Sequence, residues 1–411
     1  MSLDDYKKGK PIKNKGRHKK QAEQILATVV MGMNLVNTVA PLAVLAGAEQ
    51  KPGTAPQPAC SEAEPLDYAV LPQLADMVDR AMFARAEAAN YDGNASVPSL
   101  QYGDDQIITA GQNGIVSTMS GGEQGISSGG KGTVSTMSGG VQNISSGGSG
   151  TVDTMKAGVQ NILSGGKGTV STMFSGQQIV LSSGEGTISS MSGGSQNISS
   201  GGSGTVDIMN DGKQNISSGG VGTVSTMSAG QQIVRSGGEG TASSMNSGYQ
   251  IITSGGSGTV STMRDGTQEI YGGGSGTIST MNSGHQGVLG GSGMVSTMND
   301  GAQEILSGGS GMVSTMSGGW QMITSGVGMV SIMSSGNQIV LSSGEGTVST
   351  MNSGYQKISS GGTGTVSTMS RGSQAVMNSG SGMVVTMSGG TQSISSGGTG
   401  TVSTMSRGSQ A

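Results

Sequence analysis

The chain has 411 residues, of which 78 are glycine, 11% are charged and 2% are aromatic. This composition excludes a large compact core, because there are too few Phe, Trp, Leu and Ile side chains to fill one. The net charge of −4 gives no basic surface for nucleic acid, and the single cysteine, Cys60, excludes an intrachain disulfide.

The first 48 residues have the pattern of an export signal. A run of basic residues lies between Lys7 and Lys20, and an apolar stretch follows from Ile25 to Ala48. The stretch ends with small residues at Ala46 and Ala48, the spacing that signal peptidases cleave. We therefore predict a signal peptide over 1–48, with a membrane anchor as the alternative, and an exported bacterial protein.

Residues 49–103 read as a linker that contains one short amphipathic helix. The segment to about residue 65 is rich in Pro, Ala and Glu. Leu74, Met77, Val78 and Met82 then recur at helical spacing, which predicts a helix over about 72–89. Repeat arrays need a cap at their ends, so this helix is interpreted as a cap or spacer, with partner binding as the alternative.

An 18-residue repeat fills the region 104–411. One methionine marks each unit from Met119 to Met405, with two intervals of 17, from Met281 to Met298 and from Met316 to Met333. A glutamine follows each of these methionines five residues later, and a glycine stands two residues before each glutamine. Such a period indicates a solenoid, here of about 17 repeats.

The predicted fold class is all-β, a parallel β-helix or β-solenoid. Thr, Val and Ile favour extended strands, and glycines supply the positive φ of the corners. In one unit the structural repeat positions are Gly132, Val134, Met137, Gly140, Gln142 and Ile144. Stacking would place each residue on its own copy, with the glutamines forming an amide ladder. Val134 and Met137 are three residues apart, so both can face inward only if the strand bends between them.

The position before each glutamine varies freely, as a solvent-facing corner would. Its aromatic residues, Tyr249, Trp320 and Tyr355, are candidate surface contacts, with scattered surface residues as the alternative.

Residues for catalysis or metal binding are sparse, and we predict no enzyme, no cofactor and no metal site. The sequence has two histidines, and His285 falls at the variable corner with no fixed acid beside it. The acidic pairs Asp265 with Glu269 and Asp300 with Glu304 are the nearest approach to a carboxylate cluster. The repeated methionine is interpreted as core rather than as a copper site.

Segments such as Ser138–Gly148 (Ser-Gly-Gly-Val-Gln-Asn-Ile-Ser-Ser-Gly-Gly) resemble the passenger repeats of AIDA-type autotransporter adhesins. The resemblance implies a right-handed β-helical passenger at the cell surface, with Ser and Thr side chains as possible glycosylation acceptors. It also implies a C-terminal outer-membrane barrel, whose alternating strands of about 10 residues we do not expect within residues 104–411. The chain stops mid-repeat at Gly408–Ala411, which indicates a truncated passenger.

The predicted function is that of a secreted or surface-displayed adhesin or stalk, mediating cell adhesion, self-aggregation or biofilm formation. Its partners would be host-cell or bacterial surface receptors, or other copies of itself. The alternative is a non-binding structural spacer or matrix rod. An ice-binding solenoid fits less well, because Met294, Met312, Met329 and Met383 interrupt the row of threonines that it would need.

Overall fold

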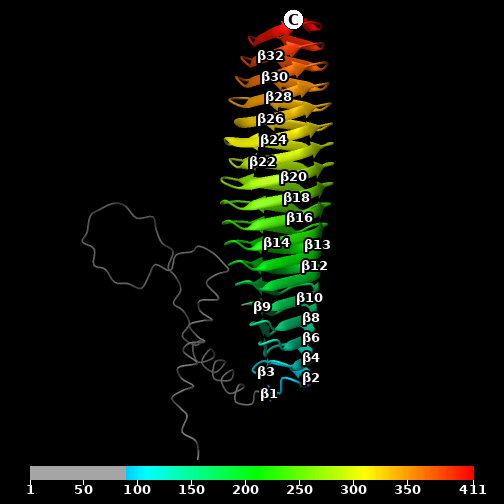
Figure 1. Cartoon of the computed structure of the whole chain (residues 1–411), viewed down its shortest axis with the longest axis vertical. Coiled ribbons are helices and arrows are strands. Elements are labelled where there is room, and N and C mark those ends of the chain that lie inside the picture. Colours follow the sequence, from blue (N-terminus) through cyan, green and yellow to red (C-terminus); the bar gives the residue numbers. More distant parts are fainter. Residues whose placement is uncertain (1–88, 164) are drawn as a thin grey trace, which may run out of the picture. The chain divides into compact units, whose positions relative to one another are not determined.

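The computed structural model describes residues 89–163 and 165–411, which form one continuous β-solenoid (Figure 1). The chain winds through about 18 turns, and the strands of successive turns pair in parallel. The predicted signal peptide, the predicted helix and most of the predicted linker lie outside the described residues. The all-β solenoid of the sequence analysis is confirmed.

Each turn has one long strand and one short strand. The long strands, which end at the repeated Met or its equivalent, are β2 Ser96–Leu100, β4 Asn113–Met119, β6 Lys131–Met137, β8 Ser149–Met155, β10 Lys167–Met173, β14 Val221–Met227, β16 Glu239–Met245, β18 Ser257–Met263, β20 Ser275–Met281, β22 Ser292–Met298, β24 Gly309–Met316, β26 Gly326–Met333, β28 Glu345–Met351, β30 Thr363–Met369, β32 Ser381–Met387 and β34 Thr399–Met405.

The short strands, which contain the repeated Gln or its equivalent, are β1 Asn90–Tyr91, β3 Asp105–Ile108, β5 Glu123–Ile126, β7 Val141–Ile144, β9 Val159–Ile162, β11 Gln177–Val180, β15 Gln231–Val234, β17 Tyr249–Ile252, β19 Thr267–Tyr271, β21 His285–Leu289, β23 Ala302–Leu306, β25 Trp320–Ile323, β27 Asn337–Val340, β29 Tyr355–Ile358, β31 Ser373–Val376, β33 Thr391–Ile394 and β35 Ser409–Gln410. In two neighbouring turns both strands merge into one, β12 Glu185–Ile198 and β13 Ser203–Ile216, with a bulge at Ser192.

Identical positions of successive turns lie side by side. In the pairing of β6 with β8, for example, Val134 lies beside Val152 and Met137 beside Met155, while Ser135 is skipped. Val134 and Met137 are both fully buried. The chain therefore bends at Ser135, which confirms that a bend brings both side chains of the Val–Met pair inward.

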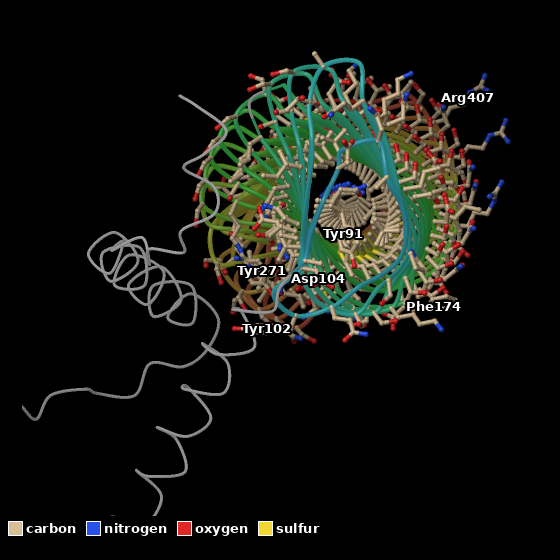
Figure 2. The ribbon with its side chains drawn as sticks, turned by 90° about the horizontal axis from the view of Figure 1, so that it is seen from below. Tyr91, Tyr102, Asp104, Phe174, Tyr271 and Arg407 are labelled. Atoms are coloured by element: carbon tan, nitrogen blue, oxygen red, sulfur yellow. The ribbon has the colours of Figure 1, made fainter. Side chains whose placement is uncertain are left out.

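The core consists of two parallel apolar columns. One column contains the Val and Met side chains of the long strands, and the other contains the Ile or Val side chain of each short strand. Outside this core, side chains such as Phe174 and Arg407 project away from the ribbon (Figure 2). The repeat positions Val134, Met137, Gln142 and Ile144 are all fully buried, as expected for a narrow core.

Two glycine positions make this narrow cross-section possible. A Cβ atom on Gly132 would lie 2.4 Å from Cδ1 of Ile126 and 2.7 Å from Oε1 of Gln124, so the inward side chains of the short strand occupy that space. Gly140 turns the corner after the long strand with a φ of 77°. At the opposite corner Ser146 and Gly147 both have positive φ, which is typical of a type I′ turn.

The two 17-residue turns are shortened at this second corner. In these turns the next inward glycine lies five positions after the buried Val or Ile of the short strand, as from Val288 to Gly293. In an 18-residue turn it lies six positions after, as from Ile252 to Gly258.

Residues of these two corners form backbone hydrogen bonds with the adjacent turn rather than within their own corner. The Gly290 N–H donates to the Leu306 carbonyl, and the Ser325 carbonyl accepts from the Gly308 N–H of the neighbouring turn. The deletions therefore leave the strand register intact.

The solenoid begins earlier than residue 104, the predicted start. The pairs β1–β3 and β2–β4 already belong to it, and Val97 and Leu100 fill the Val and Met positions of the core. The repeat motif is unrecognisable there, because Pro98 and Leu100 replace its usual residues. Residues 90–103, assigned to the linker from the sequence, are thus part of the first turn.

Candidate functional site

The repeated glutamines form a continuous amide ladder inside the solenoid. From Gln124 to Gln410, each side-chain amide donates to Oε1 of the glutamine in the preceding turn, over 2.6–2.8 Å. The side chains from Gln106 to Gln392 are fully buried. The predicted ladder is confirmed, and it fixes the register rather than contacting a ligand.

The outer wall is therefore the part of the solenoid that is available for binding. The three aromatic residues singled out from the sequence all begin a short strand and lie in one row along its outer edge. Tyr249 is 48% exposed, while Trp320 and Tyr355 are half-buried. Asn337 pairs with both Trp320 and Tyr355, so these two side chains stand two turns apart with an amide between them.

A shallow groove runs beside Trp320. It has a volume of about 480 Å³ and is lined by Trp320 together with Asp300, Ser335, Asn337 and Ser353. Its floor is made by the corner glycines Gly319, Gly336 and Gly354, which carry no side chains. The groove combines an aromatic face with hydroxyl, amide and carboxylate groups, which suits a ligand that is polar at its edge and apolar on one face.

A similar groove of about 520 Å³ lies beside Tyr249. Asp211, Lys213, Gln231 and Ser247 supply its polar groups, and corner glycines again form the floor. Sequence reasoning found the aromatic residues but missed both grooves. The signal was present in the glycine before each variable position, because a stacked column of residues without side chains leaves a hollow.

The acidic pairs noted in the sequence do not form a shared carboxylate site. Asp265 and Asp300 each accept the backbone N–H of the following glycine, at 2.8 Å. Glu269 accepts the Tyr271 hydroxyl at 2.6 Å, and this bond raises the pKa of Tyr271, helped by desolvation and by the negative charge. Glu304 lies 3.4 Å from Nε2 of His285. Each acid is thus engaged locally.

Within residues 89–163 and 165–411, no three His, Cys, Asp or Glu side chains gather in a way that could hold a metal ion. The same residues contain no helix with the length and apolar character to span a membrane.

No protein-family model matches the chain, and no curated protein matches it. Among solved structures the chain is similar to the "crystal structure of TibC-catalyzed hyper-glycosylated TibA55-350 fragment", at 28% sequence identity. The similarity covers 78% of this chain and 99% of that fragment, with a TM-score of 0.38.

Proposed function

We propose that this chain is an exported, surface-displayed adhesin or stalk of the autotransporter passenger type, acting in cell adhesion, self-aggregation or biofilm formation. The observation that carries the proposal is that each strand has inward residues, which form the core, and outward residues, which form the surface. The core and the glutamine ladder hold the rod together, while outward positions such as the one that Tyr249 occupies vary from turn to turn without disturbing them. The predicted signal over 1–48 supports export.

The row of Tyr249, Trp320 and Tyr355 is the proposed contact surface. Trp320 offers an aromatic face, and the groove beside it offers Asp300, Asn337 and Ser353 for hydrogen bonds. Sugars present both hydroxyl groups and an apolar ring face, so a glycan on a cell surface is the class of receptor that fits.

Beads coated with the purified full chain test this proposal, scored for clumping and for capture of bacterial or host cells. The expected result is that coated beads clump or bind cells and that Trp320→Ala with Tyr355→Ala reduces this several-fold. Tyr102→Ala is the matched control, because Tyr102 is 70% exposed and lies outside the row. Coated beads that neither clump nor bind would favour the alternative, a spacer that binds nothing.

We also propose that outward-facing Ser and Thr side chains are glycosylation acceptors. Positions such as Thr133 and Ser135 repeat along the outer face of the long strands, with their side chains only partly buried. The intact mass of the chain purified from its natural host tests this: excess mass in steps of one sugar residue is expected, and the unmodified mass would contradict it.

A further inference from the structure

Three Asp-Gly pairs at the corner after the long strand share one contact. In each pair the glycine N–H donates to Oδ1 of the aspartate directly before it, over 2.7–2.8 Å. The aspartates are exposed, and the glycines are half-buried with φ values of 95–97°. The pairs are Asp211–Gly212, Asp265–Gly266 and Asp300–Gly301.

This contact holds a backbone nitrogen against a carboxyl carbon. In each aspartate Cγ is bonded directly to Oδ1, so the glycine nitrogen that donates to Oδ1 also lies close to Cγ. Two groups held about 3–3.5 Å apart in a fixed orientation react much faster than freely moving ones. Glycine has no Cβ that would shield its nitrogen. Each pair is therefore arranged for attack of the glycine nitrogen on Cγ of the aspartate.

We propose that Asp211, Asp265 and Asp300 are sites of spontaneous isomerisation to isoaspartate. The glycine nitrogen forms a bond to Cγ, and the N–H proton leaves together with the carboxyl O–H as one molecule of water. The resulting cyclic imide then takes up one water at either of its carbonyl carbons. Hydrolysis at Cγ restores aspartate, whereas hydrolysis at the main-chain carbonyl gives isoaspartate. The mass is unchanged, and no oxidant or cofactor takes part.

A fourth Asp-Gly pair, Asp92–Gly93, supplies a comparison within the same chain. Oδ1 of Asp92 accepts the N–H of Asn94 at 2.8 Å, so this carboxylate is bonded to a nitrogen one residue further along. Gly93 itself is buried, and a Cβ there would lie 2.4 Å from Oε1 of Gln112. The four pairs are alike in sequence, but the structure prepares three of them for attack and not this one.

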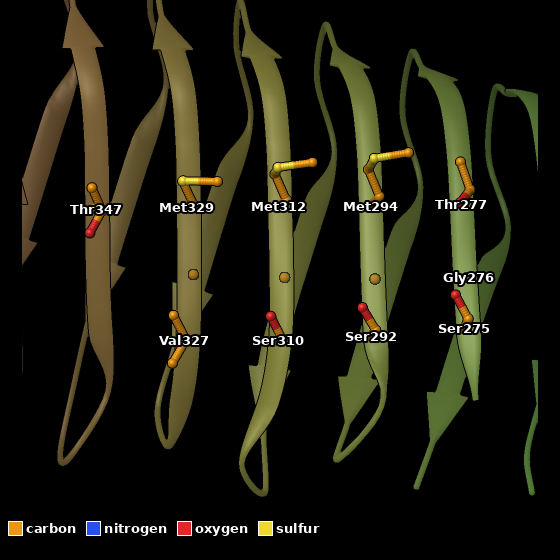
Figure 3. Close-up of a pocket in the computed structure, with 13 residues that line it drawn as sticks. Ser275, Gly276, Thr277, Ser292, Met294, Ser310, Met312, Val327, Met329 and Thr347 are labelled. Atoms are coloured by element: carbon orange, nitrogen blue, oxygen red, sulfur yellow. The ribbon is translucent and has the colours of Figure 1, made fainter. Parts of the chain in front are cut away.

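Aspartates within long strands are not arranged for this reaction. Figure 3 shows neighbouring long strands, among them that of Met312, lying parallel with an extended backbone. Asp153 on β8 and Asp207 on β13 lie in such strands, and the residues that follow them, Thr154 and Ile208, pair with neighbouring turns. Both following residues are β-branched, which crowds the backbone beside the nitrogen. We expect no isomerisation at these two positions.

Isomerisation would change both grooves of the outer wall. Asp211 lines the groove beside Tyr249, and Asp300 lines the groove beside Trp320. In isoaspartate the main chain runs through Cβ and Cγ, so the corner gains one main-chain carbon and the carboxylate is attached directly to Cα. The shape and charge of a groove would thus change with the age of the protein. This consequence for binding rests on the proposed function, whereas the isomerisation itself does not.

Incubation of the purified full chain in mildly acidic water enriched in heavy oxygen tests the proposal. Acid is used because only a protonated carboxyl group can lose water. Every imide that opens takes up one heavy oxygen, and mass spectrometry of the digested chain locates the label and separates isoaspartate from aspartate. We expect at least about tenfold more label at the three pairs than at Asp92, since a displacement of about 1 Å can slow a reaction roughly 100-fold.

The same chain unfolded in guanidinium chloride is the control. All four Asp-Gly pairs should then react at similar rates, because the local contacts are gone. The proposal is overturned if Asp92 takes up as much label as the three pairs in the folded chain, or if the three pairs take up no more than Asp153. The same preference in the unfolded chain would also overturn it. None of these measurements involves binding, so their failure is distinct from a failure of the adhesin proposal.

Discussion

The inward-facing and outward-facing residues of the solenoid lie on the same strands, but their residue types vary between turns to different extents. On β6 the inward residues Gly132, Val134 and Met137 are buried, and nearly the same residue types recur in every turn. The outward residue Lys131 is replaced by Ser, Glu, Val or Thr in other turns. An inward residue contacts its own copies above and below, so a change there disturbs three turns, whereas an outward residue meets mainly water.

β24 carries an inward-facing and an outward-facing methionine in one strand. Met312 and Met316 are the same residue type four positions apart, but Met316 is fully buried and Met312 faces outward. Residue type alone therefore does not decide the role of a methionine here. Its position in the turn does.

The largest expected effect follows from breaking the glutamine ladder in the middle. In Gln232→Leu, Oε1 of Gln214 loses its donor, while the amide of Gln250 loses its 2.6 Å acceptor and keeps only the long bonds to the Gly240 and Thr259 carbonyls, each at 3.3 Å. The orphaned oxygen and the weakened amide each cost about 1–3 kcal/mol, so the free energy of unfolding should fall by roughly 2–6 kcal/mol. Denaturant unfolding followed by circular dichroism measures this.

Gln231→Leu is the matched control, because Gln231 is the neighbouring residue on the outer wall. It should change the unfolding free energy by less than about 0.5 kcal/mol. Similar losses in both variants would show that the ladder does not set the stability.

The next largest effect separates the two methionines of β24. Met316→Ala opens a cavity in the Val–Met column and should cost about 2–5 kcal/mol. Met312→Ala removes a partly exposed side chain and should cost less than about 1 kcal/mol. Unfolding curves of the two variants give the comparison directly. Equal losses of unfolding free energy would contradict the distinction between inward-facing and outward-facing methionines.

A smaller effect is expected from adding one methyl group to a glycine. Gly132→Ala would bring its Cβ within 2.4 Å of Ile126, so the core must shift at a cost of about 1–3 kcal/mol. Gly125→Ala is the control, because no atom lies within 4 Å of the added Cβ. The midpoint of thermal unfolding should fall for Gly132→Ala and stay unchanged or rise for Gly125→Ala.

The smallest effect concerns the ionisation of the outer wall. The Glu269 carboxylate accepts the Tyr271 hydroxyl and raises the pKa of Tyr271 above its ordinary value. Because the folded-state pKa is raised, this bond stabilises the fold below the ordinary tyrosine pKa, and the contribution is lost as the pH rises through the raised value.

Glu269→Gln should therefore shift the titration of one tyrosine to lower pH, as followed by phenolate absorbance. Glu304→Gln is the control, because Glu304 lies beside His285 instead. A tyrosine titration that is the same in both variants would show that Glu269 has no influence.

The repeat made the fold class, the glutamine ladder and the inward positions predictable, because each of them depends on contacts between identical residues one turn apart. The first turn was not predictable, since Pro98 and Leu100 disguise the motif there. The grooves beside Tyr249 and Trp320 were missed for another reason. A hollow depends on how the corner glycines stack in space, and periodicity fixes the length of a turn but not its cross-section.

The glutamine ladder also gives the rod a direction. Every amide donates toward the N-terminal end, from Gln410 to Gln392 and so on down to Gln124 and Gln106, whose own amide donates to the Asp92 and Ala95 carbonyls. The amide dipoles are thus aligned and reinforce one another. A folded stretch ends with a glutamine whose Oε1 can accept the side-chain amide of the next turn. If folding proceeds from the N-terminus, each added glutamine amide finds its acceptor at once. If folding proceeds from the C-terminus, the last added glutamine has an unpaired amide N–H.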